Sequence, residues 1–343
     1  MTSSELRLSP AVQRLTALWA LTESGLGGLL HAVQMPFMGL VLAGLAMTII
    51  TLIAYYSDKP AATIGRSLIL VLIVKIIVSP HSLPSAYIAV TFQAMFAIAL
   101  YRSLGINALS ILLLTVIGMV ETATQRILSL TLLFGKSLWE ALDSVGAWVT
   151  QTYSWLLPFQ SGRTMIGAYV LIYALGGVLW GLFIYLLVVR MRSTTSTAPY
   201  RIMLDKVNQE HSGSSDTKKR KSMRMWIWLA IFLVLIIITP YFLDSEMSSG
   251  QRALYVLGRT LIALILWFAV VSPFIIKLLR SYLMSRKSEL SEEIDQVFGL
   301  LPYMKDIVRH AWAEASRVSL LRRVPVFIFR SLMYCLHFEV PIR

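Results

Sequence analysis

The chain has 343 residues, of which 57% are hydrophobic and 14% are charged, whereas about a quarter of the residues in an ordinary soluble domain are charged. Its mean hydropathy is +0.69, and several apolar runs approach or exceed the ~20 residues that a bilayer-spanning helix needs. This composition excludes a typical soluble domain and predicts an all-α polytopic membrane protein. A net charge of +13 fits the excess of Lys and Arg on the cytoplasmic side of membrane proteins, so we expect no nucleic-acid partner.

The first part of the chain contains six apolar stretches, which we expect to span the membrane. They lie near residues 15–33, 37–56, 63–79, 84–101, 105–133 and 164–190. Residues 134–160 are too polar to span. Their tryptophans, Trp139, Trp148 and Trp155, favour a segment at the membrane interface, where indole rings prefer to lie.

A basic segment follows the sixth stretch. Residues 190–224 contain nine basic and three acidic residues, and their composition is typical of a flexible, charged linker. Two further spans are predicted near 225–243 and 252–279, joined by a short loop with Asp244 and Glu246. Placing the basic linker in the cytoplasm puts this loop outside and both termini inside.

The last part of the chain is amphipathic. From Leu290 to Ala315 the apolar residues recur at steps of three and four, which predicts two amphipathic helices that meet near Pro302. The fold class is therefore about eight transmembrane helices, six and then two, followed by a cytoplasmic pair of amphipathic helices. We divide the chain into a six-helix membrane domain (1–190), a basic cytoplasmic linker (191–224) and a C-terminal part (225–343).

Several polar residues lie in or beside the predicted spans, where a charge costs roughly 2.5–3.5 kcal/mol on insertion scales. Lys75 either extends its ammonium group to the nearby interface or binds a ligand. Glu121 and Arg126 mark either a helix break or a polar face, and they serve either in ion pairs with other helices or in a ligand or ion site. The candidate substrate-binding residues are Glu23, His31, Lys75, His81, Gln93, Glu121 and Arg126.

Sequence motifs for catalysis are absent. The chain has no GxxxxGK[ST] run, no HExxH, no GxSxG and no paired aspartate signature for a diphosphate, so we expect neither an ATP site nor an enzyme. The single cysteine, Cys335, excludes an intrachain disulfide. No metal site and no cofactor are predicted.

The N-terminal part resembles a known family. "RLTALWALTESGLGGLLHAVQMPFMGLVLAGLAMTIITLIAYYS" is similar to the first helices of the substrate-binding (S) components of energy-coupling factor (ECF) transporters, in the branch described as heptaprenyl diphosphate synthase component I-like. Six spans before residue 190 also suit an S component. The resemblance implies that Ser79–Pro84 joins helices three and four at the binding-pocket face, where Lys75 and His81 bracket a polar or anionic group of the ligand.

The C-terminal part resembles the transmembrane coupling (T) component of the same systems. In that family a proline-containing segment leads to an Ala-x-x-x-Arg-Gly motif, whose arginine docks on the ATPases. In "VFGLLPYMKDIVRHAWAEASRV", Ala313 and Arg317 have this spacing, and Val318 replaces the glycine. A second motif would fall at the chain's end, where only Arg343 matches. The candidate coupling residues are Ala313, Arg317, Arg322, Arg323 and Arg343.

The resemblance implies a multi-pass subunit of the bacterial cytoplasmic (inner) membrane. Its expected partners are membrane lipids, a small vitamin-like molecule or other micronutrient, and separate cytoplasmic ABC-type ATPase subunits. One alternative is a scaffold without transport activity, whose basic tail binds anionic lipid or a protein partner. Another is an intramembrane enzyme acting on a lipid-linked substrate.

Overall fold

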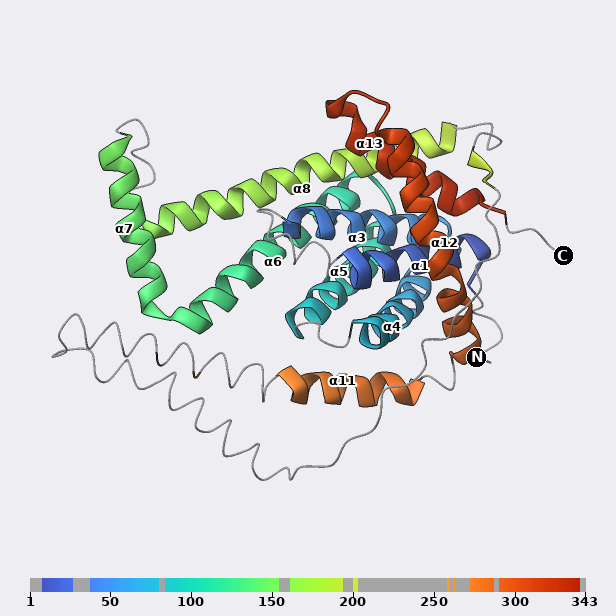
Figure 1. Ribbon diagram of the computed structural model, residues 1–343, viewed down its shortest axis with the longest axis horizontal. Helices are drawn as coiled ribbons and strands as arrows, with labels where there is room; N and C mark the ends of the chain where they lie inside the picture. The colour runs from blue at the N-terminus through green and yellow to red at the C-terminus, as the bar shows by residue number, and fades with distance from the viewer. Residues whose placement is uncertain are drawn as a thin grey trace. The chain divides into compact units, whose positions relative to one another are not determined.

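The computed structural model describes residues 8–26, 38–79, 84–153, 161–193, 200–202, 258, 262, 272–286 and 290–339. Within these ranges the chain is helical and contains no strand (Figure 1). Contacts divide it into two compact units. The first unit comprises Met1–Thr122, Tyr173–Glu210 and Tyr282–Arg343, and the second comprises Ala123–Ile172 and His211–Ser281. The division of the sequence into a membrane domain, a linker and a C-terminal part, with boundaries at residues 190 and 224, is a different division from these two units. It stays a prediction.

Each of the six predicted N-terminal spans corresponds to a helix. These helices are α1 (Pro10–Leu21, continued by the π-helix η2, Thr22–Leu26), α3 (Met38–Tyr55), α4 (Pro60–Val78), α5 (Pro84–Leu104), α6 (Ala108–Phe134) and α8 (Gly162–Ser193). Further helices are α7 (Lys136–Thr152), α11 (Ser272–Arg286), α12 (Ser291–Ala315) and α13 (Leu320–His337).

Four helices of the described residues are long and apolar enough to cross a membrane. They lie at Pro60–Val78, Ser85–Leu104, Ala108–Thr131 and Gly162–Ser193, with a shorter apolar helix at Gly39–Tyr55. These helices support a membrane protein. The predicted span 225–243 lies outside the described residues, and so does most of 252–279.

The helix ends follow local chemistry. α1 begins at Pro10 behind Ser9, whose Oγ accepts a hydrogen bond from the Val12 amide at 3.4 Å. Gly105 ends the α5 region and Gly135 the α6 region, with φ of 70° and 60°. These backbone angles favour glycine because they place a Cβ too close to the carbonyl oxygen. In the second unit, Asp143 of α7 accepts a hydrogen bond from the Gly162 amide at the start of α8 at 2.6 Å.

In the first unit, α8 packs very closely on α6. A Cβ at Gly177 would lie 2.7 Å from Val116 Cα and 2.8 Å from the Thr115 carbonyl oxygen, and one at Gly181 would lie 2.5 Å from Thr115 Oγ1. Gly177 and Gly181 form a GxxxG pair on one helix face. Such pairs let membrane helices approach at backbone distance.

The helices of the first unit alternate in direction. The C-terminal end of α8 meets that of α3, because Arg192 lies over the Tyr55 ring at 5.1 Å. The C-terminal part of α5 meets the same region of α3 through a 2.7 Å hydrogen bond between Tyr101 and Thr51. Loops 56–59 and 105–107 therefore lie at one end of the bundle. The C-terminal end of α4 and the N-terminal end of α5 lie at the other end.

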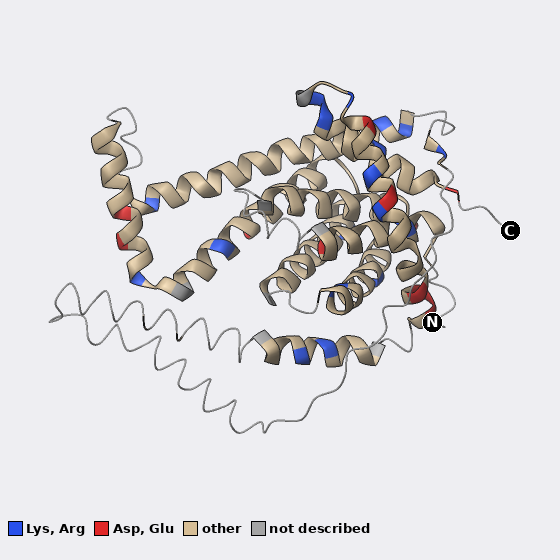
Figure 2. Cartoon of the chain, viewed as in Figure 1, with Lys and Arg blue, Asp and Glu red and all other residues tan. Residues whose placement is uncertain are grey.

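The C-terminal helices α12 and α13 pack on each other and on α1, and α12 also contacts α4. Arg14 of α1 donates a hydrogen bond to the Leu336 carbonyl of α13 at 2.6 Å. Arg66 of α4 pairs with Glu293 of α12 at 2.7 Å. We call the end of the first unit that carries these contacts the basic end, because Arg14, Arg66 and Arg192 lie there. Figure 2 marks the positions of Lys and Arg along the helices.

Two sequence predictions about the C-terminal helices are wrong in detail. α12 is one continuous helix with Pro302 inside it, so the junction of the amphipathic pair lies after Ala315. A proline removes a single hydrogen bond of the helix interior, and the buried face on both sides of it outweighs that loss. This face contains Ile294, Val297, Met304, Ile307, Ala311 and Ala315. Trp312, which the steps of three and four also place on this face, is 50% exposed.

α6 decides one further expectation, and α7 gives the structure of the segment that we expect at the membrane interface. α6 runs unbroken from Ala108 to Phe134, so Glu121 and Arg126 do not mark a helix break. Residues 136–152 of the predicted interfacial segment form α7, which is not among the spans of the described residues. Trp148 of α7 is 62% exposed, and Trp155 lies outside the described residues.

Candidate functional site

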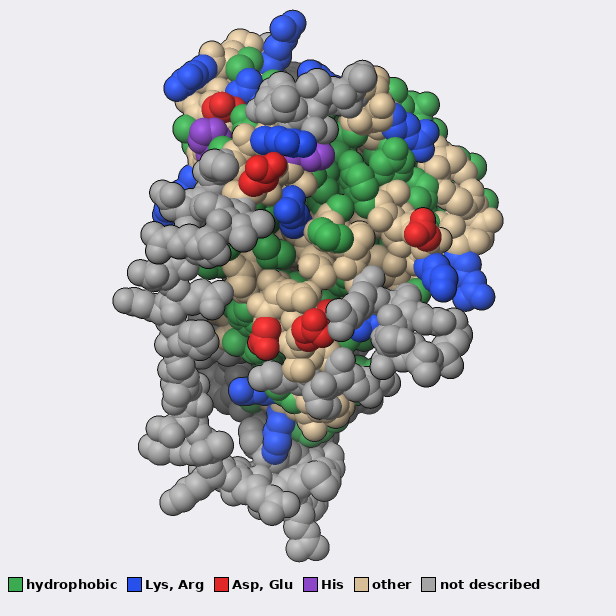
Figure 3. Space-filling view, turned by 90° about the vertical axis from the view of Figure 1, so that its right-hand side faces the viewer, with side chains coloured by type: hydrophobic (Ala, Val, Ile, Leu, Met, Phe, Trp, Pro, Cys, Tyr) green, Lys and Arg blue, Asp and Glu red, His purple; other side chains and the backbone are tan. Residues whose placement is uncertain are grey.

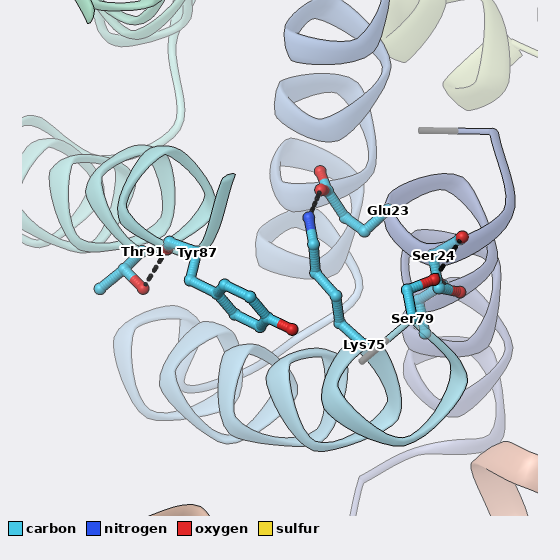
Figure 4. A network of polar contacts seen from close by, with 7 residues as sticks. Glu23, Ser24, Lys75, Ser79, Tyr87 and Thr91 are labelled. Atoms are coloured by element: carbon cyan, nitrogen blue, oxygen red, sulfur yellow. Dashed lines mark hydrogen bonds and ion pairs between the residues drawn. The ribbon is translucent and has the colours of Figure 1, made fainter. Parts of the chain in front are cut away.

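The candidate site is a buried ion pair between the ends of α1 and α4. Lys75 Nζ donates a hydrogen bond to Glu23 Oε2 at 2.8 Å, and the two side chains are 4% and 12% exposed. In Figure 4 the lysine extends from α4 toward Glu23, with the Tyr87 ring of α5 beside it. The ammonium lies 5.6 Å from the centre of that ring.

The π-helix places the carboxylate. η2 continues α1 over Thr22–Leu26 and contains Glu23. A π-turn adds a residue to the helical repeat and is frequent at functional sites. The next residue, Ser24, fixes this turn to α4, because its carbonyl accepts a hydrogen bond from Ser79 Oγ at 2.9 Å. The end of α1 is thereby fastened to the end of α4 beside the ion pair.

The ion pair argues against one of the two interpretations of Lys75, extension to the interface, while ligand binding stays a prediction. A lysine that extends to the interface would be exposed at its tip, whereas Lys75 is buried against a carboxylate. In low dielectric such a pair offsets the desolvation of both ions only if its geometry is good. A ligand carrying one of these charges could replace one partner. An anionic group would compete with Glu23 for Lys75, and an ammonium would compete with Lys75 for Glu23.

Gln93 and Glu121 lie on neighbouring helices of the same bundle. Gln93 of α5 is buried, and a Cβ at Gly118 of α6 would lie 3.9 Å from its Cγ. Glu121 follows one turn later on α6. Its Oε2 is buried and has no hydrogen-bond partner among the described residues. The alternating helix directions bring Glu121 to the half of the bundle that contains Glu23 and Lys75.

The remaining predicted site residues are not gathered there. Arg126 is exposed, belongs to the second unit and has no recorded ion pair with Glu121 in the described structure. His31 and His81 lie outside the described residues. Within the described ranges, no group of His, Cys, Asp and Glu side chains is arranged to hold a metal ion.

Four of the five candidate coupling residues lie at or near the turn between α12 and α13. Ala313, Arg317 and Arg322 are exposed there. Arg323 is partly buried, since it donates a hydrogen bond to the Ser316 carbonyl at 2.8 Å and lies over the Trp312 ring at 5.8 Å. Figure 3 shows basic, acidic and histidine side chains gathered beside apolar ones on this side of the molecule. Arg343 lies outside the described residues.

Sequence reasoning missed the partners that complete these sites. Glu23 and Lys75 were each named, but their pairing depends on how α1 and α4 are aligned, which hydropathy does not encode. Tyr87 and Ser24 carried no signal of their own, and Ser79 was named only as the start of the Ser79–Pro84 loop. The Gly177–Gly181 pair was recognisable as GxxxG in an apolar run and would have predicted the close contact of α8 with another helix.

No family model, curated protein or solved structure matches this chain. Its function is therefore argued from the residues and their geometry.

Proposed function

We propose that the chain is a multi-pass subunit of the bacterial cytoplasmic membrane in an ECF-type uptake system. It binds a small vitamin-like molecule or other micronutrient within the helical bundle, and it couples to separate ATPase subunits through the α12–α13 turn. The resemblance of both parts of the sequence to S and T components supports this proposal.

One structural observation carries the proposal: α1 joins the candidate coupling helices to the candidate ligand site. At the basic end, Arg14 donates to the Leu336 carbonyl, and Cys335 Sγ lies 3.4 Å from the Arg14 carbonyl oxygen. At the other end, η2 continues α1 and holds Glu23 against Lys75. A movement of α13 would therefore change the position of α1 and, through it, the buried ion pair.

The exposed arginine at the turn supports docking of a partner protein. The apolar face of α12 is used against α1 and α13, so it is not available to lie on lipid. Arg317, which follows the end of α12, is exposed, and a guanidinium can hold a carboxylate with two parallel hydrogen bonds. This arrangement suits an acidic surface on an ATPase.

The test is ATP hydrolysis by the complex purified from cells that supply the ATPases. Arg317→Ala should lower ATPase association and hydrolysis at least about tenfold, because removal of a charged hydrogen bond at an interface costs about 2–5 kcal/mol. Arg317→Lys should recover only part, since lysine lacks the fork. The matched control is Arg309→Ala, which removes an exposed arginine of α12 whose ion pair within the described residues is with Asp306, at 3.7 Å.

Equal losses in Arg317→Ala and Arg309→Ala would contradict specific docking. A wild-type complex that contains no ATPase, together with full function of Arg317→Lys, would favour the scaffold instead.

A further inference from the structure

Glu121 is a half-buried carboxylate that no cation of the described residues neutralises. Its Oε2 is enclosed and has no hydrogen-bond partner there. Lys75, the buried cation of the same half of the bundle, is already held by Glu23 at 2.8 Å. Arg126 is exposed and belongs to the second unit. A carboxylate in low dielectric without a counter-charge is costly, so this part of the bundle keeps an unbalanced negative charge.

The face of α6 that carries Glu121 lies against α5 and α3. Residues three and four apart share one face of a helix, so Glu121 and Thr122 lie on the same face as Gly118. A Cβ at Gly118 would lie 3.9 Å from Gln93 Cγ of α5, and a Cβ at Gly39 of α3 would lie 3.0 Å from Thr122 Cγ2. All these residues belong to the first unit. The carboxylate is therefore turned toward neighbouring helices and not toward lipid alone.

Gln93 adds a second polar group without a recorded partner. Its residue is 4% exposed, and no hydrogen bond of its side chain is recorded within the described ranges. A primary amide has a carbonyl acceptor and two N–H donors, and burying it without partners costs free energy. Gln93 approaches α6 at Gly118, one helical turn from Glu121. Two acceptors, one of them charged, thus lie on neighbouring helices with no donor between them.

We propose that Glu121 and Gln93 bind the ammonium group of a small primary amine with an apolar body. One N–H of the ammonium donates to the Glu121 carboxylate and another donates to the Gln93 carbonyl oxygen. The positive charge neutralises Glu121. The apolar body suits the surroundings, because Met47 of α3 is fully buried and its Sδ would lie 2.7 Å from a Cβ at Gly118. The inference rests on the proposed uptake of a small molecule and names its chemical class.

Other cations fit these groups less well. A quaternary ammonium has no N–H to donate and is recognised by aromatic cages. A calcium ion takes six to eight oxygen ligands, whereas no group of three or more His, Cys, Asp and Glu side chains is arranged for a metal in the described part of the chain. An anion would be repelled by Glu121.

The test is binding of hexylammonium chloride to the purified full chain in neutral detergent, at about pH 7. A ligand that binds the folded state raises the midpoint of thermal unfolding, and a titration gives the apparent dissociation constant. Hexyltrimethylammonium, hexan-1-ol and hexanoate carry the same chain and serve as comparisons. Hexylammonium should bind at least about tenfold more tightly than each of them, because hydrogen bonds to a charged group are the stronger kind.

Three variants locate the site. Glu121→Gln should weaken hexylammonium at least about tenfold, and Gln93→Leu should weaken it at least about threefold. The matched control is Glu140→Gln, which neutralises an exposed carboxylate of α7 that pairs with Lys136 and should leave binding unchanged. Partition of the probe into micelles is the same for all proteins. Circular dichroism and gel filtration identify variants that fail to fold, and the comparison of probes on the unmodified chain decides in that case.

Three results would overturn the inference. Binding of hexyltrimethylammonium as tight as that of hexylammonium would exclude recognition of N–H donors. Equal losses in Glu121→Gln and Glu140→Gln would reduce the effect to general attraction of cations. Tighter binding of hexanoate would transfer recognition to a cation such as Lys75. If the amine fails while Arg317→Ala still lowers ATPase association, the ligand class is wrong and the proposed uptake function stands. If both fail, neither is supported.

Discussion

Lys75 keeps its charge in an apolar helix because Glu23 reaches it from another helix. The pair is almost fully buried, so each ion depends on the other for its solvation. The energetic cost of a buried pair appears mainly when one partner is removed and the other remains charged in low dielectric. This distinguishes the pair from the exposed Lys136–Glu140 pair of α7, at 3.6 Å, which contributes little to stability.

We predict that removing one member of the Glu23–Lys75 pair destabilises the protein more than removing both. Lys75→Met or Glu23→Gln alone should lower the free energy of unfolding by about 3–5 kcal/mol, while the double variant should recover most of the loss. Reversible unfolding in mixed micelles measures all four proteins of the cycle. Additive losses would show that the two side chains do not interact.

Glu121 is the opposite case, a carboxylate with one buried oxygen and no recorded partner in the described part of the chain. Because such a group is costly to bury, Glu121→Ala should leave the midpoint of thermal unfolding unchanged or raise it. If Glu121 serves a ligand, the same variant impairs uptake.

Glu293→Ala is the comparison. It removes the partner of Arg66 and should lower stability by about 1–3 kcal/mol. Equal destabilisation by both would make Glu121 structural.

At the scale of helices, the contact of α8 with α6 depends on glycine. A methyl group at Gly177 would overlap the backbone of α6 at Thr115 and Val116, and backbone cannot move aside as a flexible side chain can. Gly167 lies on the same helix, and a Cβ there meets nothing within 4 Å. The two glycines thus separate the effect of packing from that of helix propensity.

We predict that Gly177→Ala destabilises the protein by about 1–3 kcal/mol, since it forces the helices apart. Gly167→Ala should instead leave stability unchanged or raise it by up to about 1 kcal/mol, because alanine favours a helix. Thermal unfolding of both variants under one condition is the measurement. A loss in Gly167→Ala equal to that in Gly177→Ala would remove the packing explanation.

The sequence predicted helices better than it predicted their contacts. Apolar runs such as 63–79 and 164–190 located α4 and α8 to within a few residues, because burial in a membrane and in a bundle both require continuous apolar stretches. The predicted division of α12 at Pro302 was wrong. Burial of the apolar face of the helix outweighed the local preference of proline to break a helix. The Glu23–Lys75 pair and the approach of Gln93 to α6 depend on how distant helices meet. Periodicity carries no information about that.

At the scale of the first unit, the alternating helices separate two kinds of chemistry. Arg14, Arg66, Arg190 and Arg192 lie at the basic end with α12 and α13, whereas the Glu23–Lys75 pair, neutral in sum, lies at the other end. Membrane proteins carry an excess of basic residues on their cytoplasmic side. This rule favours an orientation in which the basic end of the bundle lies on the cytoplasmic side of the membrane. The site near Glu23 would in that case face the outer half of the bilayer, where an uptake protein captures its ligand.

This orientation leads to the last prediction, which a membrane-impermeant maleimide can test on intact cells. Cys335, the only natural cysteine, should not react with the maleimide. Burial raises the pKa of its thiol to about 12, and only the thiolate reacts. Cysteines at Lys59 in loop 56–59 and at Ser214 in the predicted linker should react only after the cells are opened. Cysteines at His81 and Ser248 should react from outside. Of these positions, His81, Ser214 and Ser248 lie outside the described residues. Labelling of Lys59→Cys and His81→Cys from the same side would contradict the alternating bundle, and a complete exchange of the two sides would reverse the orientation.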